Sequence, residues 1–131
     1  MLNLKEDVYY RVVSFHSIPE DQKEKYSLEQ LDEVDIIADQ ISMFYPKDHI
    51  YKNVSQIVML QKMDSDKEDD DSRERLNELI DIVKKSISKR DQNTNFNVGV
   101  GEIVKGYRNL KNSYKQSRIA MRFMKIARRI T

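Results

Sequence analysis

The chain has 131 residues, which is enough for one domain with a hydrophobic core and too few for two. Hydrophobic residues make up 39% of it and charged residues 34%, and no apolar run approaches the roughly 20 residues that a membrane span requires. With no cysteine and two histidines, disulfides, thiolate chemistry and a histidine-rich metal site are excluded. Residues 1–10 hold no apolar signal core, so we expect a single cytoplasmic domain without membrane contact.

The net charge of +1 conceals a division along the chain. From residue 103 onward there are nine lysines or arginines and no acidic residue, which leaves 14 basic against 22 acidic side chains in the remainder. Such an asymmetry is typical of a nucleic-acid patch, of a docking surface for an acidic neighbour, or of a solvated helix face.

The first half of the chain predicts a strand, a helix and a hairpin. Residues 8–18 are rich in β-branched and aromatic side chains and apolar on both faces, which indicates a central strand. Apolar residues then recur at helical spacing from Leu28 until Pro46 ends the helix. Residues 49–53 and 56–62 predict two short strands that meet in a turn.

The second half predicts a loop, a helix, a strand and a final helix. Residues 64–72 are too charged to be buried and indicate an acidic, solvated loop; a calcium loop is disfavoured because Asp69 and Arg75 replace its glycine and glutamate. An apolar stripe from Leu76 to Ile87 predicts a helix, and residues 96–100 alternate as a half-buried strand does.

The predicted order is β-α-β-β-α-β-α. Two β-α-β units that share a hairpin indicate an α+β, ferredoxin-like fold, in which helices pack mainly on one face of an antiparallel sheet.

The final helix has two faces on a helical wheel. One sector is basic; the opposite sector is apolar and includes Ile119. The small residues Ser113, Ser117 and Ala120 lie toward the buried side, which favours close approach of the helix to the sheet. We interpret the basic sector as a solvated face, because no aromatic residues alternate with its cations as in a binder of single strands.

The strand and helix at residues 95–124 resemble the last conserved block of the GGDEF-like domain of CdaR/PucR-type bacterial transcription regulators. That block combines a V-G-I-G strand with a helix marked S-Y-x-x-A-x-x-A. The matching residues here are Val98, Gly99, Val100, Gly101, Ser113, Tyr114 and Ala120, while Ser117 replaces an alanine. We expect Gly99 and Gly101 to provide either backbone freedom or room for the helix.

The resemblance implies a non-catalytic regulatory domain. Residues 1–131 would form one GGDEF-like module of a longer regulator, able to self-associate and to act on DNA only through a separate helix-turn-helix domain. A response regulator of the AraC type, which carries a similar insert, is an alternative parent.

The resemblance also locates the place where catalysis would occur. Active GGDEF cyclases hold Mg²⁺ and a nucleotide with carboxylates at the end of the first strand and in the hairpin. Residues 14–17 and 52–56 contain no acidic side chain here. Because the cation needs such oxygen ligands, we expect no enzyme activity, no metal and no cofactor.

An alternative function is ligand sensing. The degenerate cleft would then retain a nucleotide or a small acidic metabolite, and Lys52 and Asn53 of the hairpin are the polar residues that we nominate to bind it.

Overall fold

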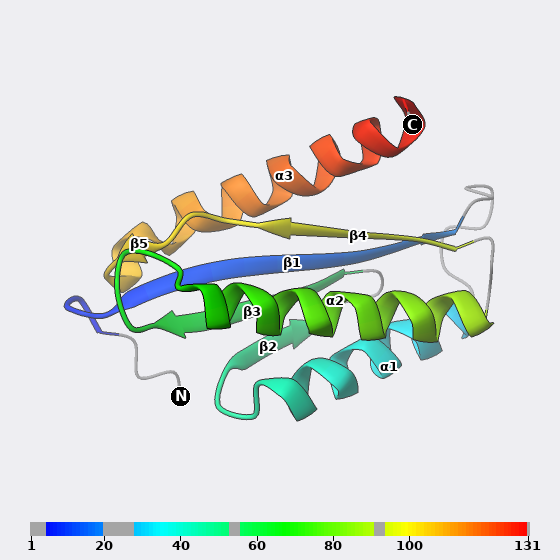
Figure 1. Ribbon diagram of the computed structural model, residues 1–131, viewed down its shortest axis with the longest axis horizontal. Coiled ribbons are helices and arrows are strands. Elements are labelled where there is room, and N and C mark those ends of the chain that lie inside the picture. The colour runs from blue at the N-terminus through cyan, green and yellow to red at the C-terminus, as the bar shows by residue number, and fades with distance from the viewer. Residues whose placement is uncertain (1–4, 20–27, 53–55, 91–93, 131) are drawn as a thin grey trace.

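Figure 1 shows a computed structural model that describes residues 5–19, 28–52, 56–90 and 94–130, with side chains placed for 5–16, 33–52, 56–87 and 96–120. The turn predicted between the two hairpin strands lies outside these ranges. No helix within them is long and apolar enough to cross a membrane. The elements are β1 (Tyr9–Pro19), α1 (Leu28–Phe44), β2 (His49–Lys52), β3 (Gln56–Met63), α2 (Asp70–Arg90), β4 (Thr94–Val100), β5 (Val104–Lys105), a 3₁₀ turn (Tyr107–Asn109) and α3 (Leu110–Ile130).

β1 occupies the centre of an antiparallel sheet with strand order β2-β3-β1-β4. On one side it pairs with β3, from Tyr9 opposite Met63 to His16 opposite Gln56. On the other side it pairs with β4 from Val13 onward. The predicted α+β class is therefore confirmed, with the strand that is apolar on both faces in the middle of the sheet.

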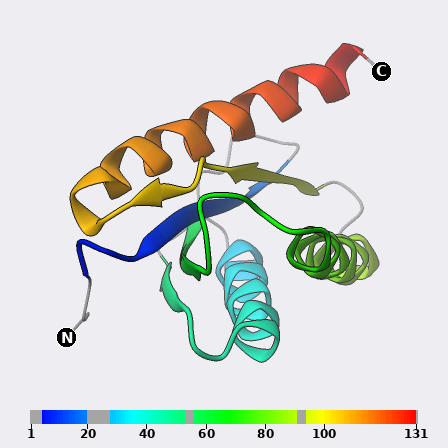
Figure 2. The same cartoon turned by 60° about the vertical axis from the view of Figure 1, so that its left-hand side comes forward.

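The sheet lies between two layers of helices. α1 and α2 cover one face and α3 covers the other, as both views show (Figures 1 and 2). Alternate residues of β1 serve the two layers, because successive side chains of a strand point to opposite faces. Val13 and Phe15 join the main core under α1 and α2, whereas Tyr10 and Val12 form a smaller cluster with Tyr114 of α3. We expected the helices to lie mainly on one face of the sheet. Two of the three, α1 and α2, share a face, and α3 lies on the other.

Small polar residues join α3 to the sheet. The Val12 amide donates a hydrogen bond of 2.9 Å to the Ser113 hydroxyl, and the hydroxyls of Ser14 and Ser117 lie 2.8 Å apart. All three serines are fully buried. Their short side chains let the helix approach the strand closely while every buried hydroxyl keeps a partner.

Gly101 lies where α3 comes closest. A Cβ atom there would stand 2.1 Å from the Ser113 carbonyl oxygen, so a larger residue would force one of the two backbones to shift. Gly106 has a positive φ, of 84°, whereas Gly99 and Gly101 do not. Of the two roles predicted for Gly101, this geometry favours room for the helix.

The sequence did not indicate β5 and the turn that follows it. After a short break, this two-residue strand continues the β4 edge and pairs with the start of β1, with Val104 opposite Tyr10. The Gly106 amide then donates to the Val8 carbonyl oxygen at 2.8 Å. Two residues are too few to produce an alternating pattern.

The predicted apolar face of α3 was wrong at Ile119, which is 63% exposed. The contact with the sheet centres on Ser113 and Ser117, and this rotates Ile119 toward solvent. The wheel placed Ser113 and Ser117 on the buried side correctly, but it extended the buried face too far and included Ile119.

We predict that Gly101→Ala lowers the free energy of unfolding by about 3 kcal/mol, because overpacking against a backbone atom cannot be relieved by a side-chain rotation. Urea denaturation measures the loss. Ser117→Ala is the matched variant at the same interface and is expected to cost about 1 kcal/mol, the contribution of one buried hydrogen bond. Equal stability of Gly101→Ala and the unmodified chain would contradict the close approach described above.

Candidate functional site

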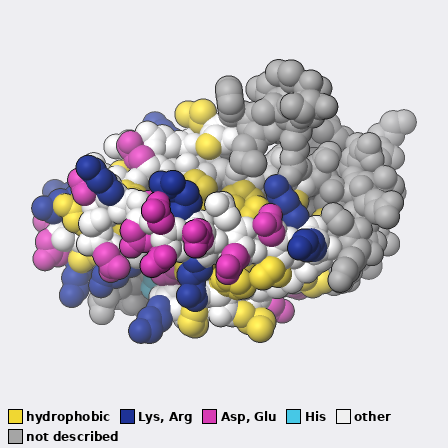
Figure 3. All heavy atoms as spheres, in the orientation of Figure 1, with side chains coloured by type: hydrophobic (Ala, Val, Ile, Leu, Met, Phe, Trp, Pro, Cys, Tyr) yellow, Lys and Arg dark blue, Asp and Glu magenta, His cyan; other side chains and the backbone are white. Residues whose placement is uncertain are grey.

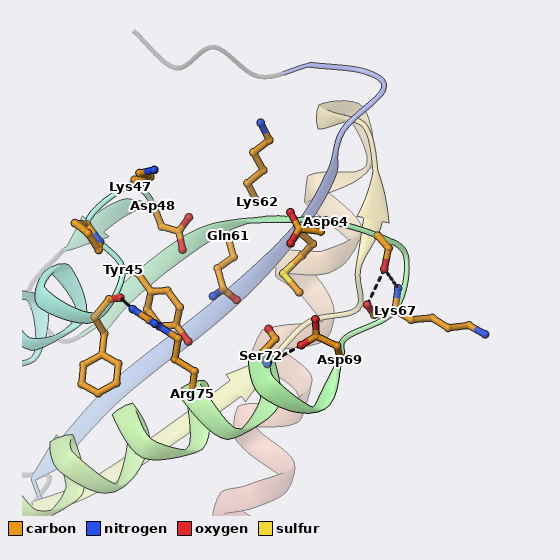
Figure 4. Close-up of a pocket in the computed structure, with 14 residues that line it drawn as sticks. Tyr45, Lys47, Asp48, Gln61, Lys62, Asp64, Lys67, Asp69, Ser72 and Arg75 are labelled. Atoms are coloured by element: carbon orange, nitrogen blue, oxygen red, sulfur yellow. Dashed lines mark hydrogen bonds between the residues drawn. The ribbon is translucent and has the colours of Figure 1, made fainter.

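A pocket of about 410 Å³ opens where α1 ends and α2 begins (Figure 4). It lies at the end of the β2–β3 pair opposite to the hairpin turn, since residues 45–48 precede β2 and residues 61–63 complete β3. The loop at residues 64–69 and the first turns of α2 form its other walls. The pocket therefore gathers three segments that are distant in sequence.

A buried arginine lies beneath the floor of the pocket. Arg11 of β1 is 1% exposed and stands opposite Gln61 of β3. Its Nε and Nη2 atoms donate to the Gln61 side-chain oxygen at 3.0 and 2.6 Å, and its Nη1 atom donates to the carboxylate of Glu68. A buried charge is costly unless it is paired and hydrogen-bonded, so Glu68 ties the loop to the sheet.

The side wall consists of two rings and a second arginine. The Arg75 guanidinium lies 5.8 Å from the ring centre of Phe44 and 5.4 Å from that of Tyr45. It also donates a hydrogen bond of 2.5 Å to the Phe44 carbonyl oxygen, which the end of α1 leaves without a helical partner. These contacts fix the end of α1 against the start of α2.

Tyr45 and Asp48 face Gln61 inside the pocket (Figure 4). Burial raises the pKa of both side chains. For Asp48, the Lys62 backbone amide and the Gln61 side chain oppose this shift in part. For Tyr45, Gln61 and then Arg75 oppose it, yet the buried hydroxyl has no hydrogen-bond partner of good geometry within the described residues. The floor thus offers a carboxyl and a hydroxyl that are poorly solvated.

The rim of the pocket carries charges of both signs. Lys47, Lys62 and Lys67 are exposed, as are Asp64 and Asp69. Asp69 also accepts a hydrogen bond of 2.7 Å from the Ser72 amide at the start of α2. A ligand with both anionic and donor groups would fit this mixture better than a purely anionic or apolar one.

The acidic segment differs in part from the expected solvated loop at residues 64–72. α2 begins at Asp70, so residues 70–72 are helical, and Asp69 takes the capping position. Asp64 and Asp66 are exposed as predicted, but Glu68 turns inward to Arg11. The buried Arg11 guanidinium attracts the Glu68 carboxylate. The sequence alone gave no reason to expect that Glu68 differs from the other acidic residues of this segment.

The nominated ligand residues lie elsewhere. Lys52 forms an exposed ion pair of 2.6 Å with Asp35, and this hydrogen bond raises its pKa. Asn53 lies outside the described residues. Lys52 does not line the pocket, so a ligand role for the two residues stays a prediction about the hairpin end.

The motif residues hold α3 against the sheet and take no part in the pocket. Gly99 is buried opposite Ser14, and Gly101 and Ser113 form the close contact described above. Tyr114 is half-buried on the smaller cluster with the Arg118 guanidinium 5.8 Å from its ring centre, and Ala120 is partly exposed.

Ser14 and Phe15, which lie within β1, do not fit a magnesium site. Phe15 lies in the main core, where its ring stacks on Phe96 at 6.1 Å between centres, and Ser14 faces Ser117. Phe15 offers an aromatic ring and Ser14 a hydroxyl that is already hydrogen-bonded, whereas Mg²⁺ prefers carboxylate oxygens as ligands. Within the described ranges no three His, Asp or Glu side chains are grouped as metal ligands.

The residues of the pocket were missed by sequence reasoning. One signal was present, since Arg11 places a permanent charge in a strand rich in β-branched and aromatic residues. A charge in such a position implies a buried partner. That the partners are Gln61 and Glu68 depends on strand register and loop course, which no local pattern gives.

Comparison with known proteins gives one family. The model of the GGDEF-like domain matches residues 1–123. No curated protein matches the chain. Among solved structures, a de novo designed protein, Foldit4, is similar over 70% of this chain and 94% of its own, with 13% sequence identity and a TM-score of 0.39.

We predict that Asp48→Asn stabilises the fold at pH 7 and changes little below about pH 4. A folded-state pKa above the unfolded value means that the protonated carboxyl favours the fold, and that stability is lost as the pH rises through the folded pKa. The side-chain amide of the Asp48→Asn variant does not ionise, so this loss of stability does not occur. Urea denaturation across the acidic range measures it, with the exposed Asp66→Asn as control. A gain in stability that persists unchanged in acid would contradict the role of burial.

Proposed function

Because the chain belongs to the GGDEF-like domain family, we propose that it is a non-catalytic regulatory module of a bacterial transcription regulator of the CdaR/PucR type. It self-associates in the cytoplasm and passes a signal to a DNA-binding domain outside this chain. The proposal that the domain is non-catalytic rests on one observation. Residues 14–17 and 52–56, where a cyclase holds its cation, contain no acidic side chain.

The packing around β1 supports this proposal. Phe15 packs in the main core and the Ser14 hydroxyl is hydrogen-bonded to Ser117 of α3, so neither side chain is available for a substrate. Several exposed apolar side chains lie on different elements, and a contact between molecules that covers one of them would bury apolar area. The most exposed among the described residues are Met43, Ile119 and Tyr51, at 81%, 63% and 54%.

We predict that the purified domain forms dimers or larger species at about 100 μM, a concentration at which weak and transient interfaces are populated. Light scattering over a dilution series measures this. Incubation with Mg²⁺ and GTP or ATP is expected to give no turnover above a blank without protein. A strict monomer would contradict self-association, and product formation would contradict the non-catalytic part.

Ligand sensing is a second candidate function, favoured by the pocket rather than by the hairpin. The pocket is large enough for a small metabolite, and its floor holds an unpartnered tyrosine hydroxyl and a poorly solvated carboxyl. A hydroxyl that the protein leaves without a hydrogen bond, beside a buried carboxyl, is available to a ligand. The nucleotides or small acidic metabolites expected from the sequence remain the classes to test.

Calorimetry with nucleotides and dicarboxylates separates the two locations. If the pocket senses the ligand, we expect Arg75→Ala to weaken binding at least about tenfold through loss of a charged contact, and Lys52→Ala to leave it unchanged. The reverse result would return the site to the hairpin. Absence of heat with every compound of both classes would contradict this function.

A further inference from the structure

The outer face of α2 carries a row of acidic side chains. Glu74, Glu78 and Asp81 are all exposed and lie on one side of the helix, opposite its apolar stripe. Figure 3 shows a band of acidic side chains across the face of the molecule along which α2 runs in Figure 1. Ile82, which is 40% exposed, lies beside the row. Lys85 follows one turn later, so the acidic row ends there.

The outer face of α3 carries the complementary row. Lys111, Lys115 and Arg118 are exposed on the side of the helix away from the sheet. Ile119, 63% exposed, lies beside this row as Ile82 lies beside the other. α3 therefore presents cations and one isoleucine where α2 presents carboxylates and one isoleucine.

The two rows have the same spacing. In each helix the second charge comes four residues after the first, the third charge three residues later, and the isoleucine immediately after it. Both rows thus span the same length of helix at 1.5 Å per residue. Because each row has a single sign, the charges match with the helices running in either direction, and Glu78 and Lys115 meet at the centre in both.

The rows cannot meet within one chain. α2 and α3 lie on opposite faces of the sheet (Figure 2). Within the described residues, none of the six charges forms an ion pair, since the pairs involve Arg11, Lys52 and Arg108 with Glu68, Asp35 and Glu6. Both rows are therefore free for a second molecule.

We propose that α2 of one copy docks on α3 of another copy, with Glu78 and Lys115 at the centre of the contact. This inference rests on the self-association in the proposed function and names its surfaces. The contact is head-to-tail, because the two surfaces of each copy face opposite ways. Each copy then keeps one unused surface, so association continues beyond the dimer unless a ring closes.

Such a contact is weak and sensitive to salt. Exposed ion pairs contribute little individually and are screened once the Debye length falls below their separation. We expect the association constant to fall at least about tenfold when the ionic strength rises from about 20 mM to about 500 mM. A contact made mainly by apolar side chains would not weaken in this way.

Charge reversal tests the proposal by sedimentation equilibrium at low salt. Glu78→Lys and Lys115→Glu are each expected to reduce association at least about tenfold. The two single variants mixed together should associate again, because every contact between unlike variants is then complementary. The double variant should also recover. Asp66→Lys and Lys47→Glu are the matched controls, with the same charge changes on exposed sites away from both rows, and should associate like the unmodified chain.

The outcomes separate this inference from the proposed function. If the unmodified chain associates and both single variants associate equally well, self-association stands and these surfaces are wrong. If the unmodified chain is a monomer at low salt, self-association fails and the inference fails with it. A monomer that binds a labelled DNA duplex through Lys115 would assign the basic row to nucleic acid and also overturn the proposal.

Discussion

The burial of both faces of β1 is the constraint on which the rest of the structure depends. Val13 and Ser14 are adjacent in sequence and both fully buried, one toward α1 and α2 and the other toward α3. A strand can serve two layers only because its side chains alternate between faces. The main core is hydrophobic, whereas the contact with α3 relies on short serine side chains and on Gly101. The α1 and α2 layer is therefore held mainly by apolar area, whereas α3 is held by a smaller apolar cluster together with close backbone approach.

A departure from that apolar strand creates the candidate site. Arg11 continues the face of Val13 beyond the main core, and its buried charge requires partners. Gln61 supplies one from the neighbouring strand and Glu68 supplies another by drawing the loop inward. The same cluster restricts solvation around Asp48 and Tyr45, whose raised pKa values have burial as their largest cause. Gln61, which pairs with Arg11, also lines the pocket, so the buried charge and the pocket share this residue.

The sheet also organises the charge of the molecule. α1, which has five acidic residues and no basic one, lies with α2 on one face of the sheet, and the basic helix α3 lies on the other, so the division seen in the sequence becomes a division in space. A domain with opposite charges on opposite faces cannot neutralise itself, and this favours contacts between molecules. The pocket lies at the end of the β2–β3 pair, beside the first turns of α2.

The sequence by itself determined the order of elements, the central place of β1 and the identity of the GGDEF-like block. These follow from local periodicity and from short-range spacing, which each segment carries without its neighbours. Only the tertiary structure decided that Glu68 reaches Arg11, that Ile119 faces solvent and that a pocket forms beside Asp48. Strand register, helix rotation and loop course depend on contacts between distant segments, and a pattern read along one segment contains no information about them.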